Sequence, residues 1–259
     1  MKLRARYVEK PWGRTLLPER FITEAGRRIG EIWFPTDDSF PLLVKFLFTS
    51  EKLSVQVHPD DEQAKRLGHA RGKAECWYIV DAEPDARIGL GLLDEVSEDE
   101  LRSAALDGSI EQLIRWWPVS AGDFIYVEPG TIHAIGAGLS LLEIQQNSDV
   151  TFRLFDYGRP RELHLGDAIA VASRKRYPEE RFQKVDPADD RTLIDGPAFT
   201  IVHSHEDAMQ DRTRWAVPLE GSIACGDQVA RPGECLVLGP GERLVSDGAR
   251  MLLGATPGA

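Results

Sequence analysis

The stretch from Leu53 to Asp61, which reads Leu-Ser-Val-Gln-Val-His-Pro-Asp-Asp, constrains the possible fold more than any other part of the chain. Side chains alternate between the two faces of a β-strand, so this stretch predicts a strand with one apolar and one polar face. The apolar row is Leu53, Val55 and Val57, and the polar row is Ser54, Gln56 and His58. Pro59 ends the strand because proline has no N–H to donate. A hydroxyl, an amide and an imidazole in one row predict a polar site facing this strand.

The composition is typical of a globular protein and argues against nucleic acid as a partner. Hydrophobic residues make up 42% and charged residues 28% of the 259-residue chain. The formal net charge is −11 and the sequence pI is near 5.1, whereas binding to a phosphate backbone requires a basic surface. A small phosphorylated ligand needs only a local cluster of lysine and arginine and remains compatible with this charge.

The sequence does not predict a membrane or secreted protein. No run approaches about 20 consecutive apolar residues, and the basic start over residues 1–6 is not followed by an apolar run. The cysteines, Cys76, Cys225 and Cys235, are too few and odd in number for a disulfide framework. We expect Cys225 and Cys235 to be free thiols rather than a pair across a hairpin, and we expect a cytoplasmic protein. The sequence leaves the oligomeric state open.

Short apolar runs separated by glycine and proline turns predict a mainly β protein in two parts. We expect a larger β domain over residues 1–173 and a small β domain over residues 198–259. The polar stretch 174–197 contains three prolines and many charges of both signs, and it is interpreted as a linker.

Two segments depart from this strand pattern. Ser97-Glu-Asp-Glu100 is a capping box that predicts a helix to about Asp107, and Ser109-Ile-Glu-Gln112 predicts a second helix that Pro118 stops. Together they form a predicted helical insertion near 97–117. Residues 2–30 are expected to be irregular, and within them Trp12 is expected in a loop, either as a plug at the end of the fold or as a ligand contact.

Four residues from three separate stretches of the chain have the chemistry of a metal site. Gln56 and Glu75 offer oxygen, and His58 and His133 offer nitrogen, a mixture that suits Zn²⁺ or another borderline divalent ion. Glu75 lies on a strand that also carries Lys73 on the same face, and His133 follows a Pro-Gly turn. A rival histidine pair in His203-Ser-His-Glu206 has no matching third element, so we interpret it as a surface strand end.

At this point the sequence resembles the cupin superfamily and, within it, the type I mannose-6-phosphate isomerases. The motifs that carry the resemblance cover about residues 10–172. They are Ser-Val-Gln-Val-His-Pro-Asp-Asp (54–61), Gly-Lys-Ala-Glu (72–75), Pro-Gly-Thr-Ile-His (129–133) and Gln-Gln-Asn-Ser-Asp-Val-Thr-Phe-Arg (145–153). The resemblance implies a cupin-type (jelly-roll) β-barrel with a few inserted helices and a second, smaller cupin-like β domain.

The resemblance also implies a set of site residues. The implied metal ligands are Gln56, His58, Glu75 and His133, with one Zn²⁺ or another divalent ion per chain. Arg153 is the implied active-site arginine, and the implied pocket residues are Trp12, Lys45, Ser54, Lys73 and Glu143. Because a guanidinium stays protonated, Arg153 would hold negative charge, and Lys73 or Glu143 would transfer the proton.

The implied activity is the interconversion of mannose 6-phosphate and fructose 6-phosphate by proton transfer through an enediolate. The chain departs from the longer family members, which have a tyrosine where this chain has Ile135 and carry a large helical domain, so it resembles the short bacterial form. Two alternatives remain. One is a non-catalytic, sugar-binding regulatory cupin, and the other is a metal oxygenase, against which Gln56 argues.

Overall fold

The protein is described from a computed structural model, which covers residues 1–21, 26–37 and 39–257. The chain divides into two compact units that do not follow sequence order. The first unit comprises Met1–Phe46, Leu142–Asn147 and Lys184–Ala259, and the second comprises Leu47–Leu141 and Ser148–Gln183. Strands β3 (Leu42–Thr49), β10 (Leu139–Gln146) and β12 (Phe182–Lys184) begin in one unit and end in the other.

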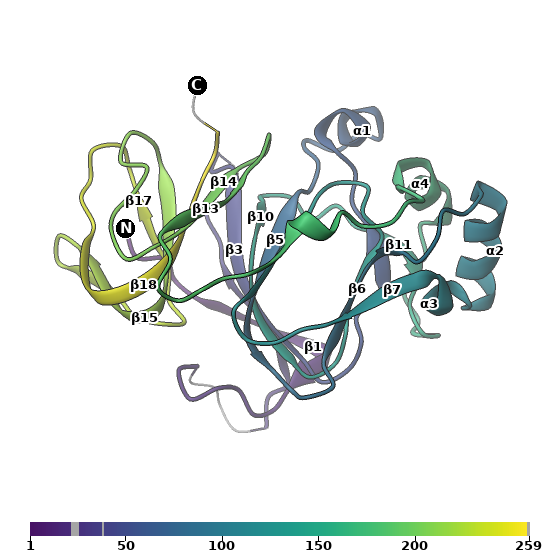
Figure 1. Cartoon of the computed structure of the whole chain (residues 1–259), viewed down its shortest axis with the longest axis horizontal. Coiled ribbons are helices and arrows are strands. Elements are labelled where there is room, and N and C mark those ends of the chain that lie inside the picture. Colours follow the sequence, from purple (N-terminus) through teal and green to yellow (C-terminus); the bar gives the residue numbers. More distant parts are fainter. Residues whose placement is uncertain (22–25, 38, 258–259) are drawn as a thin grey trace. The chain divides into compact units, whose positions relative to one another are not determined.

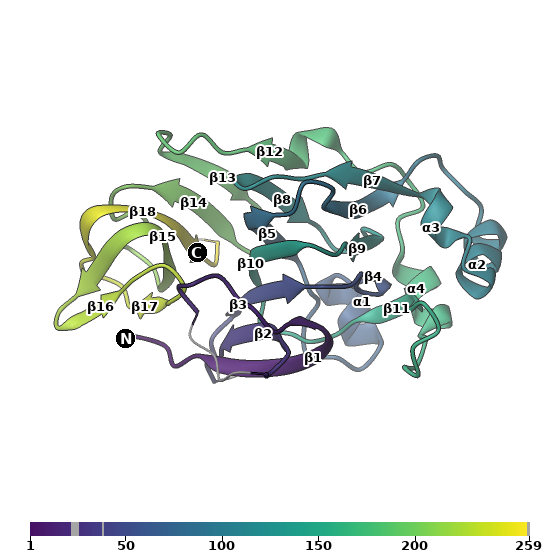
Figure 2. The same ribbon diagram turned by 90° about the horizontal axis from the view of Figure 1, so that it is seen from below.

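The second unit is built on a five-stranded antiparallel sheet, in the order β11-β4-β9-β6-β7 (Figures 1 and 2). Its strands are β4 (Val55–Val57), β6 (Arg87–Leu92), β7 (Ile114–Pro118), β9 (His133–Ile135) and β11 (Phe152–Phe155). The unit also contains the antiparallel pair of β5 (Glu75–Ala82) with β8 (Asp123–Val127). The sheet is open, with β11 and β7 at its edges, so its described strands do not close into a hydrogen-bonded barrel.

Helices α2 (Glu98–Asp107), α3 (Ile110–Leu113) and α4 (Leu165–Val171) of the second unit pack on one face of this five-stranded sheet. Its other helical elements are α1 (Asp61–Arg66) and the 3-10 turn Glu179–Arg181. Val55 and Val57 of β4 belong to the same buried cluster as Leu101 of α2 and Ile169 of α4. The apolar row of β4 therefore packs against helices, which confirms the predicted alternation and leaves Gln56 on the opposite face.

The predicted length of the second helix of the insertion is wrong. Helix α2 begins at the Ser97 capping box and ends at Gly108 in the left-handed conformation, as expected. Helix α3 ends at Leu113, however, and residues 114–118 form β7, which pairs with β6. Aromatic residues at 116 and 117 favour a strand, and their indole N–H groups donate to backbone carbonyls of Glu111 and Leu90.

The expectation of irregular structure over residues 2–30 is also wrong for much of that stretch. Arg6–Arg14 forms β1, which pairs with β2 (Ile29–Phe34). The register is interrupted, since both Glu9 and Arg14 lie opposite Ile29. Pro11 falls within this bulge, where its missing N–H removes no ladder hydrogen bond. Trp12 is therefore part of a strand and not of a loop, and it is 3% exposed. The same expectation for residues 22–25 lies outside the described residues.

The C-terminal part of the first unit is a six-stranded sheet with its own core. The order is β13-β14-β18-β15-β16, and β17 also pairs with β15. The bounds are β13 (Arg191–Asp195), β14 (Thr200–Ser204), β15 (Arg214–Cys225), β16 (Gln228–Ala230), β17 (Leu236–Leu238) and β18 (Val245–Ala255). Ala216, Leu238 and Met251 lie in its buried cluster. Residues 258–259, part of the predicted small domain, lie outside the described residues.

Three further expectations can be compared with the structure. All three cysteines are free thiols, as predicted for Cys225 and Cys235. The stretch 174–197, interpreted as a linker, contains the 3-10 turn and β12 and β13. Within the described ranges, no helix is long and apolar enough to cross a membrane.

Candidate metal centre

His58, Glu75 and His133 come together in the second unit, each from a different strand region. His58 follows β4, Glu75 begins β5 and His133 begins β9. One potential ligand atom from each residue lies within 4.8 Å of the others. Oε1 of Glu75 is 3.6 Å from Nε2 of His58 and 3.3 Å from Nε2 of His133. All three side chains are at most 1% exposed, so the cluster is buried.

Backbone carbonyls orient both imidazoles. Nδ1 of His58 lies 2.9 Å from the carbonyl oxygen of Val150, and Nδ1 of His133 lies 2.8 Å from that of Thr131. A carbonyl only accepts, so each Nδ1 carries the proton and each Nε2 carries a lone pair. Both lone pairs therefore face the carboxylate of Glu75, which is the tautomer that metal coordination through Nε2 requires.

The protonation states of the cluster suit metal binding. Burial and the nearby ammonium of Lys73 lower the pKa of His58 to about 3. Burial likewise lowers the pKa of His133, although Glu75 opposes the shift. Burial by itself raises the pKa of a carboxyl, but Lys73 and His58 more than offset it and hold the pKa of Glu75 well below its usual value. Neutral imidazoles and an ionised carboxylate are the forms that bind a cation.

One oxygen of Glu75 shows that the cluster fits a metal ion. Oε1 is buried and has no hydrogen-bond partner among the described residues, although it faces two imidazole nitrogens that carry lone pairs. A buried carboxylate oxygen without a donor is costly unless a cation is supplied. Nitrogen and oxygen donors of this kind suit Zn²⁺ and similar divalent ions. The residues present therefore fit a divalent cation.

The polar row of β4 reaches this cluster through strand register. Gln56 lies directly opposite His133 on β9 and directly opposite Arg153 on β11. Opposed residues on neighbouring strands share a face of the sheet, so Arg153, Gln56 and His133 form one row across three strands. Nε2 of Gln56 lies 3.2 Å from Nε2 of His133, and its Oε1 accepts a 3.2 Å hydrogen bond from the hydroxyl of Ser54. A half-turn of the amide would present the oxygen to the cluster instead.

Lys73 and Arg153 are the cations of this face. Nζ of Lys73 lies 3.0 Å from Nε2 of His58 and also pairs with Oε2 of Glu75. Burial and the neighbouring Arg161 lower the pKa of Arg153. The Nε group of Arg153 is buried without a hydrogen-bond partner among the described residues. The structure thus brings six of the predicted site residues into one part of the second unit, and these are Ser54, Gln56, His58, Lys73, Glu75 and His133, with Arg153 in the same row.

The remaining predicted site residues lie in the first unit. Nζ of Lys45 is 2.6 Å from Oε1 of Gln145 and 3.4 Å from Oε1 of Glu143. The same ammonium lies 4.5 Å from the ring centroid of Trp33. Lys45 and Glu143 are each less than 7% exposed, so the lysine in this apolar run is buried and paired. Trp12 is buried on β1.

Sequence reasoning missed the residues that position the cluster. A Cβ on Gly72 would lie 2.5 Å from the carbonyl oxygen of Pro59 and from the carbonyl carbon of Asp60. Only glycine permits this approach, which places Lys73 and Glu75 beside His58, and the backbone N–H of Lys73 donates to Pro59. The indole of Trp77 meets His133 edge to face at 5.5 Å. The role of Gly72 could have been predicted from the Gly-Lys-Ala-Glu motif. The roles of Thr131 and Val150 could not, because each acts through its backbone carbonyl and not through its side chain.

Among the described residues, the rival histidines His203 and His205 do not belong to a group of side chains that could hold a metal ion. Nδ1 of His203 on β14 lies 2.6 Å from the carbonyl oxygen of Asp189, and His205 pairs with Asp190 at 2.8 Å. The group of His58, Glu75 and His133 is the candidate that the described part of the chain provides.

Comparison with known proteins agrees with this geometry. Residues 1–91 match the family model described as phosphomannose isomerase type I, catalytic domain. The predicted resemblance to type I phosphomannose isomerases is confirmed. Mannose-6-phosphate isomerase ManA of Bacillus subtilis is 42% identical over 174 residues, and mannose-6-phosphate isomerase of Streptococcus mutans is 39% identical over 170 residues. The first match covers 63% of this chain and 55% of the relative, and the second covers 62% and 54%. The chain thus matches little more than half the length of these curated relatives.

Solved phosphomannose isomerase structures share the fold over almost the whole chain. The mannose 6-phosphate isomerase from Bacillus subtilis has a TM-score of 0.83 at 27% identity and covers 98% of this chain and 98% of its own. A variant of phosphomannose isomerase from Salmonella typhimurium has a TM-score of 0.77 at 13% identity, and the match covers 99% of both chains. At this identity the match shows a similar fold. The mainly β, cupin-type fold predicted from the phosphomannose isomerase resemblance is confirmed.

Proposed function

We propose that the protein is a metal-dependent aldose–ketose isomerase that interconverts mannose 6-phosphate and fructose 6-phosphate. The observation that carries the proposal is the buried cluster of His58, Glu75 and His133, whose donor atoms face one another with the protonation that a cation requires. The similarity to mannose-6-phosphate isomerases supplies the reaction and the substrate class. A cytoplasmic location is part of the proposal and is supported by the three free cysteines.

The proposed metal ligands are Gln56, His58, Glu75 and His133, and the proposed ion is one Zn²⁺ per chain. Gln56 joins this set because its amide lies beside Nε2 of His133. A divalent cation held by these residues would supply Lewis-acid stabilisation of the negative charge that develops on the sugar. An amide is a weaker ligand than a carboxylate or an imidazole, so Gln56 would be the weakest of the four proposed ligands.

Arg153 is proposed to hold negative charge during the reaction. It lies in the same row as Gln56, and its Nε–H has no partner among the described residues, so it is available to an anionic group. A guanidinium remains protonated and therefore does not serve as the base. Its planar pair of N–H groups suits either the enediolate or the phosphate of the substrate.

Proton transfer between C2 and C1 is assigned to Lys73 or Glu143, and the two assignments are separable by experiment. Lys73 touches two of the proposed ligands, and Glu143 is a buried carboxylate paired with Lys45. A base that moves a proton between neighbouring carbons must lie within hydrogen-bond reach of both. Trp12, Lys45 and Ser54 are proposed to line the substrate pocket with Lys73 and Arg153.

The experiment is a coupled assay of mannose 6-phosphate isomerisation on protein of measured metal content. We expect activity that chelation removes and that Zn²⁺ restores. Exchange of the C2 hydrogen with deuterated solvent follows proton transfer alone, so Lys73→Met and Glu143→Gln identify the base by loss of exchange. Tight binding of the sugar phosphate with neither turnover nor exchange would replace this proposal with a non-catalytic, sugar-binding cupin. Oxygen uptake on iron-loaded protein would replace it with an oxygenase.

A further inference from the structure

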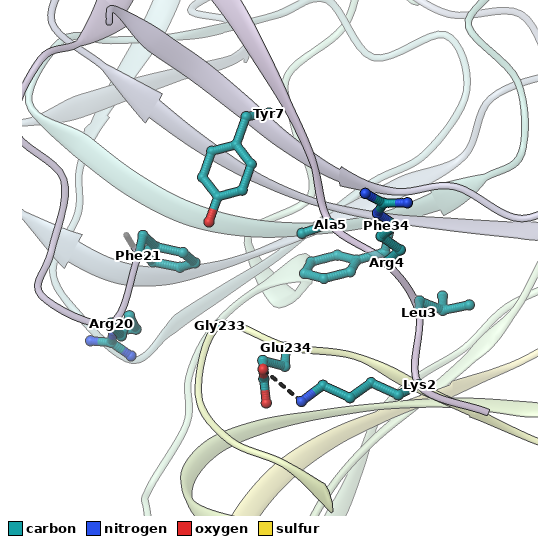
Figure 3. A pocket seen from close by; sticks show the side chains of 10 residues that line it. All are labelled: Lys2, Leu3, Arg4, Ala5, Tyr7, Arg20, Phe21, Phe34, Gly233 and Glu234. Carbon is teal, nitrogen blue, oxygen red and sulfur yellow. Dashed lines mark ion pairs between the residues drawn. The ribbon is translucent and has the colours of Figure 1, made fainter. Parts of the chain in front are cut away.

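A cavity within the first unit is formed where the N-terminal residues run beside the turn at Gly233 (Figure 3). Its volume is about 510 Å³, which is in the range of sites for small molecules. It is lined by Lys2, Leu3, Arg4, Ala5, Tyr7, Arg20, Phe21, Phe34, Gly233 and Glu234. The metal cluster contributes no residue to this cavity.

The apolar wall of the cavity is pre-formed. Leu3, Phe21 and Phe34 are at most 6% exposed. The ring of Phe46 meets the ring of Phe21 edge to face at 4.9 Å and that of Phe34 at 6.1 Å, so both rings are held in place. A Cβ on Gly233 would lie 3.0 Å from the ring of Phe21, and the absence of a side chain at this position keeps the space open.

The cavity carries an excess of positive charge in a chain whose net charge is −11. Among the described residues, no hydrogen-bond or ion-pair partner is found for the guanidinium groups of Arg4 and Arg20. Lys2 is already engaged, since its Nζ lies 2.7 Å from Glu234 and 2.9 Å from the carbonyl oxygen of Val229. Two unpaired arginines on the rim of one cavity, against a single neutralised acid, favour an anionic ligand.

The arrangement of these groups indicates the shape of that ligand. In Figure 3 the guanidinium groups of Arg4 and Arg20 lie on opposite sides of the cavity, with the rings of Phe21 and Phe34 between them. The hydroxyl of Tyr7 points into the space between the two arginines. Burial and the nearby Glu234 raise the pKa of Tyr7, so its hydroxyl keeps its proton and can donate. A ligand that contacts both guanidinium groups therefore carries anionic groups at two separate positions.

We propose that this cavity binds a small organic molecule with two separated phosphate groups, of the sugar bisphosphate class. One phosphate pairs with Arg4 and the other with Arg20. The carbon skeleton lies over Phe21 and Phe34, and a hydroxyl or ring oxygen accepts from Tyr7. The site is separate from the proposed reaction, because none of its residues is a proposed ligand or substrate contact, and ligand binding here does not depend on turnover.

The test is isothermal titration of the metal-containing protein with fructose 1,6-bisphosphate at low salt. We expect one molecule bound per chain, with affinity that weakens as salt is raised. Arg4→Ala and Arg20→Ala should each weaken binding by about tenfold, because each removes a charge-assisted contact. Tyr7→Phe, which keeps the ring, should cause a smaller loss. Arg102→Ala, which removes an exposed arginine of α2, is the matched control and should change binding less than about twofold.

Other outcomes would overturn the proposal. Unchanged binding in the double variant Arg4→Ala, Arg20→Ala, with its melting temperature preserved, would place the ligand elsewhere. Loss of binding in His133→Ala would assign the bisphosphate to the metal centre. Tighter binding of a dicarboxylate such as glutarate would show that the cavity selects carboxylates. Binding of inorganic phosphate with equal affinity would show that the two arginines do not act on one molecule.

Discussion

Nζ of Lys73 lies 3.0 Å from Nε2 of His58, the atom through which that histidine would bind a metal. The lone pair on Nε2 is available because Nδ1 donates to Val150. The same ammonium also pairs with Glu75, so one lysine contacts two proposed ligands of the centre. Metal binding therefore has to displace this ammonium from His58, and the two cations compete for one lone pair.

Replacement of Lys73 by methionine tests this competition. We expect Lys73→Met to tighten Zn²⁺ binding by about tenfold, since a positive charge next to the ion is removed, and to lower turnover sharply. Metal titration against a competing chelator measures the first effect, and the coupled assay measures the second. Lys65→Met, in which an exposed lysine of α1 is changed, should leave both unchanged. Weaker metal binding in Lys73→Met would make the lysine a support of the centre and not a competitor.

His133→Ala should remove most of the metal and most of the activity while the fold is retained. One of the facing imidazoles is lost, and the sheet is held by packing that does not involve this ring. Elemental analysis and circular dichroism measure the two effects. His205→Ala, the same change at an exposed histidine, should retain both metal and activity. Full activity in His133→Ala would contradict the assignment of the centre.

Arg153→Lys should lower kcat by roughly 10²-fold with no change in metal content. Lysine keeps the positive charge but loses the planar two-point contact, and small misplacements at a reacting group have large effects. Steady-state kinetics and elemental analysis on the same preparation separate the two quantities. The control is Arg176→Lys, at an exposed arginine that pairs with Asp94. A parallel loss of metal would show that Arg153 supports the centre and does not act on substrate.

Gly72→Ala should weaken metal binding although no ligand is changed. The new Cβ would meet backbone atoms of Pro59 and Asp60 at 2.5 Å, so the strand that carries Glu75 must move away from His58. We expect a lower melting temperature and a reduced affinity for Zn²⁺. Gly166→Ala is the control, because nothing lies within 4 Å of a Cβ there, and alanine in α4 should be neutral or stabilising by about 0.5–1 kcal/mol.

The metal-free protein should lose stability as the pH falls from about 6.5 towards 3. The pKa of His58 is about 3 in the folded state and near 6.5 when unfolded, so the unfolded chain binds the proton first. The contribution is present above the unfolded pKa and is lost as the pH falls through this window, in total a few kcal/mol. The lowered pKa values of His133 and Glu75 act in the same direction.

Denaturant unfolding in the presence of a chelator at several pH values measures this slope. His58→Gln should reduce this slope between pH 6.5 and 4, because that position no longer titrates, and His133 keeps the part of the slope that remains. A free energy of unfolding that is constant over the same range in the unsubstituted protein would show that His58 is not held neutral.

The sequence by itself determined which residues of the Leu53–Asp61 stretch face the core and which face the site. The period of a strand is two residues, and this is a local property that needs no knowledge of the neighbouring strands. The buried position of Val55 and Val57 against helices follows from it. The residue types of His58, Glu75 and His133 likewise indicated a metal site. The motifs around them carried the resemblance to type I phosphomannose isomerases.

Only the tertiary structure decided which residues meet. Gln56 lies between His133 and Arg153 because of the register of three strands, and register is set by pairing between distant segments and not by local pattern. The same applies to residues 114–118, which pair with β6 in place of continuing a helix. The tautomers of both histidines depend on backbone carbonyls of Val150 and Thr131, which every residue type possesses and which sequence therefore cannot distinguish.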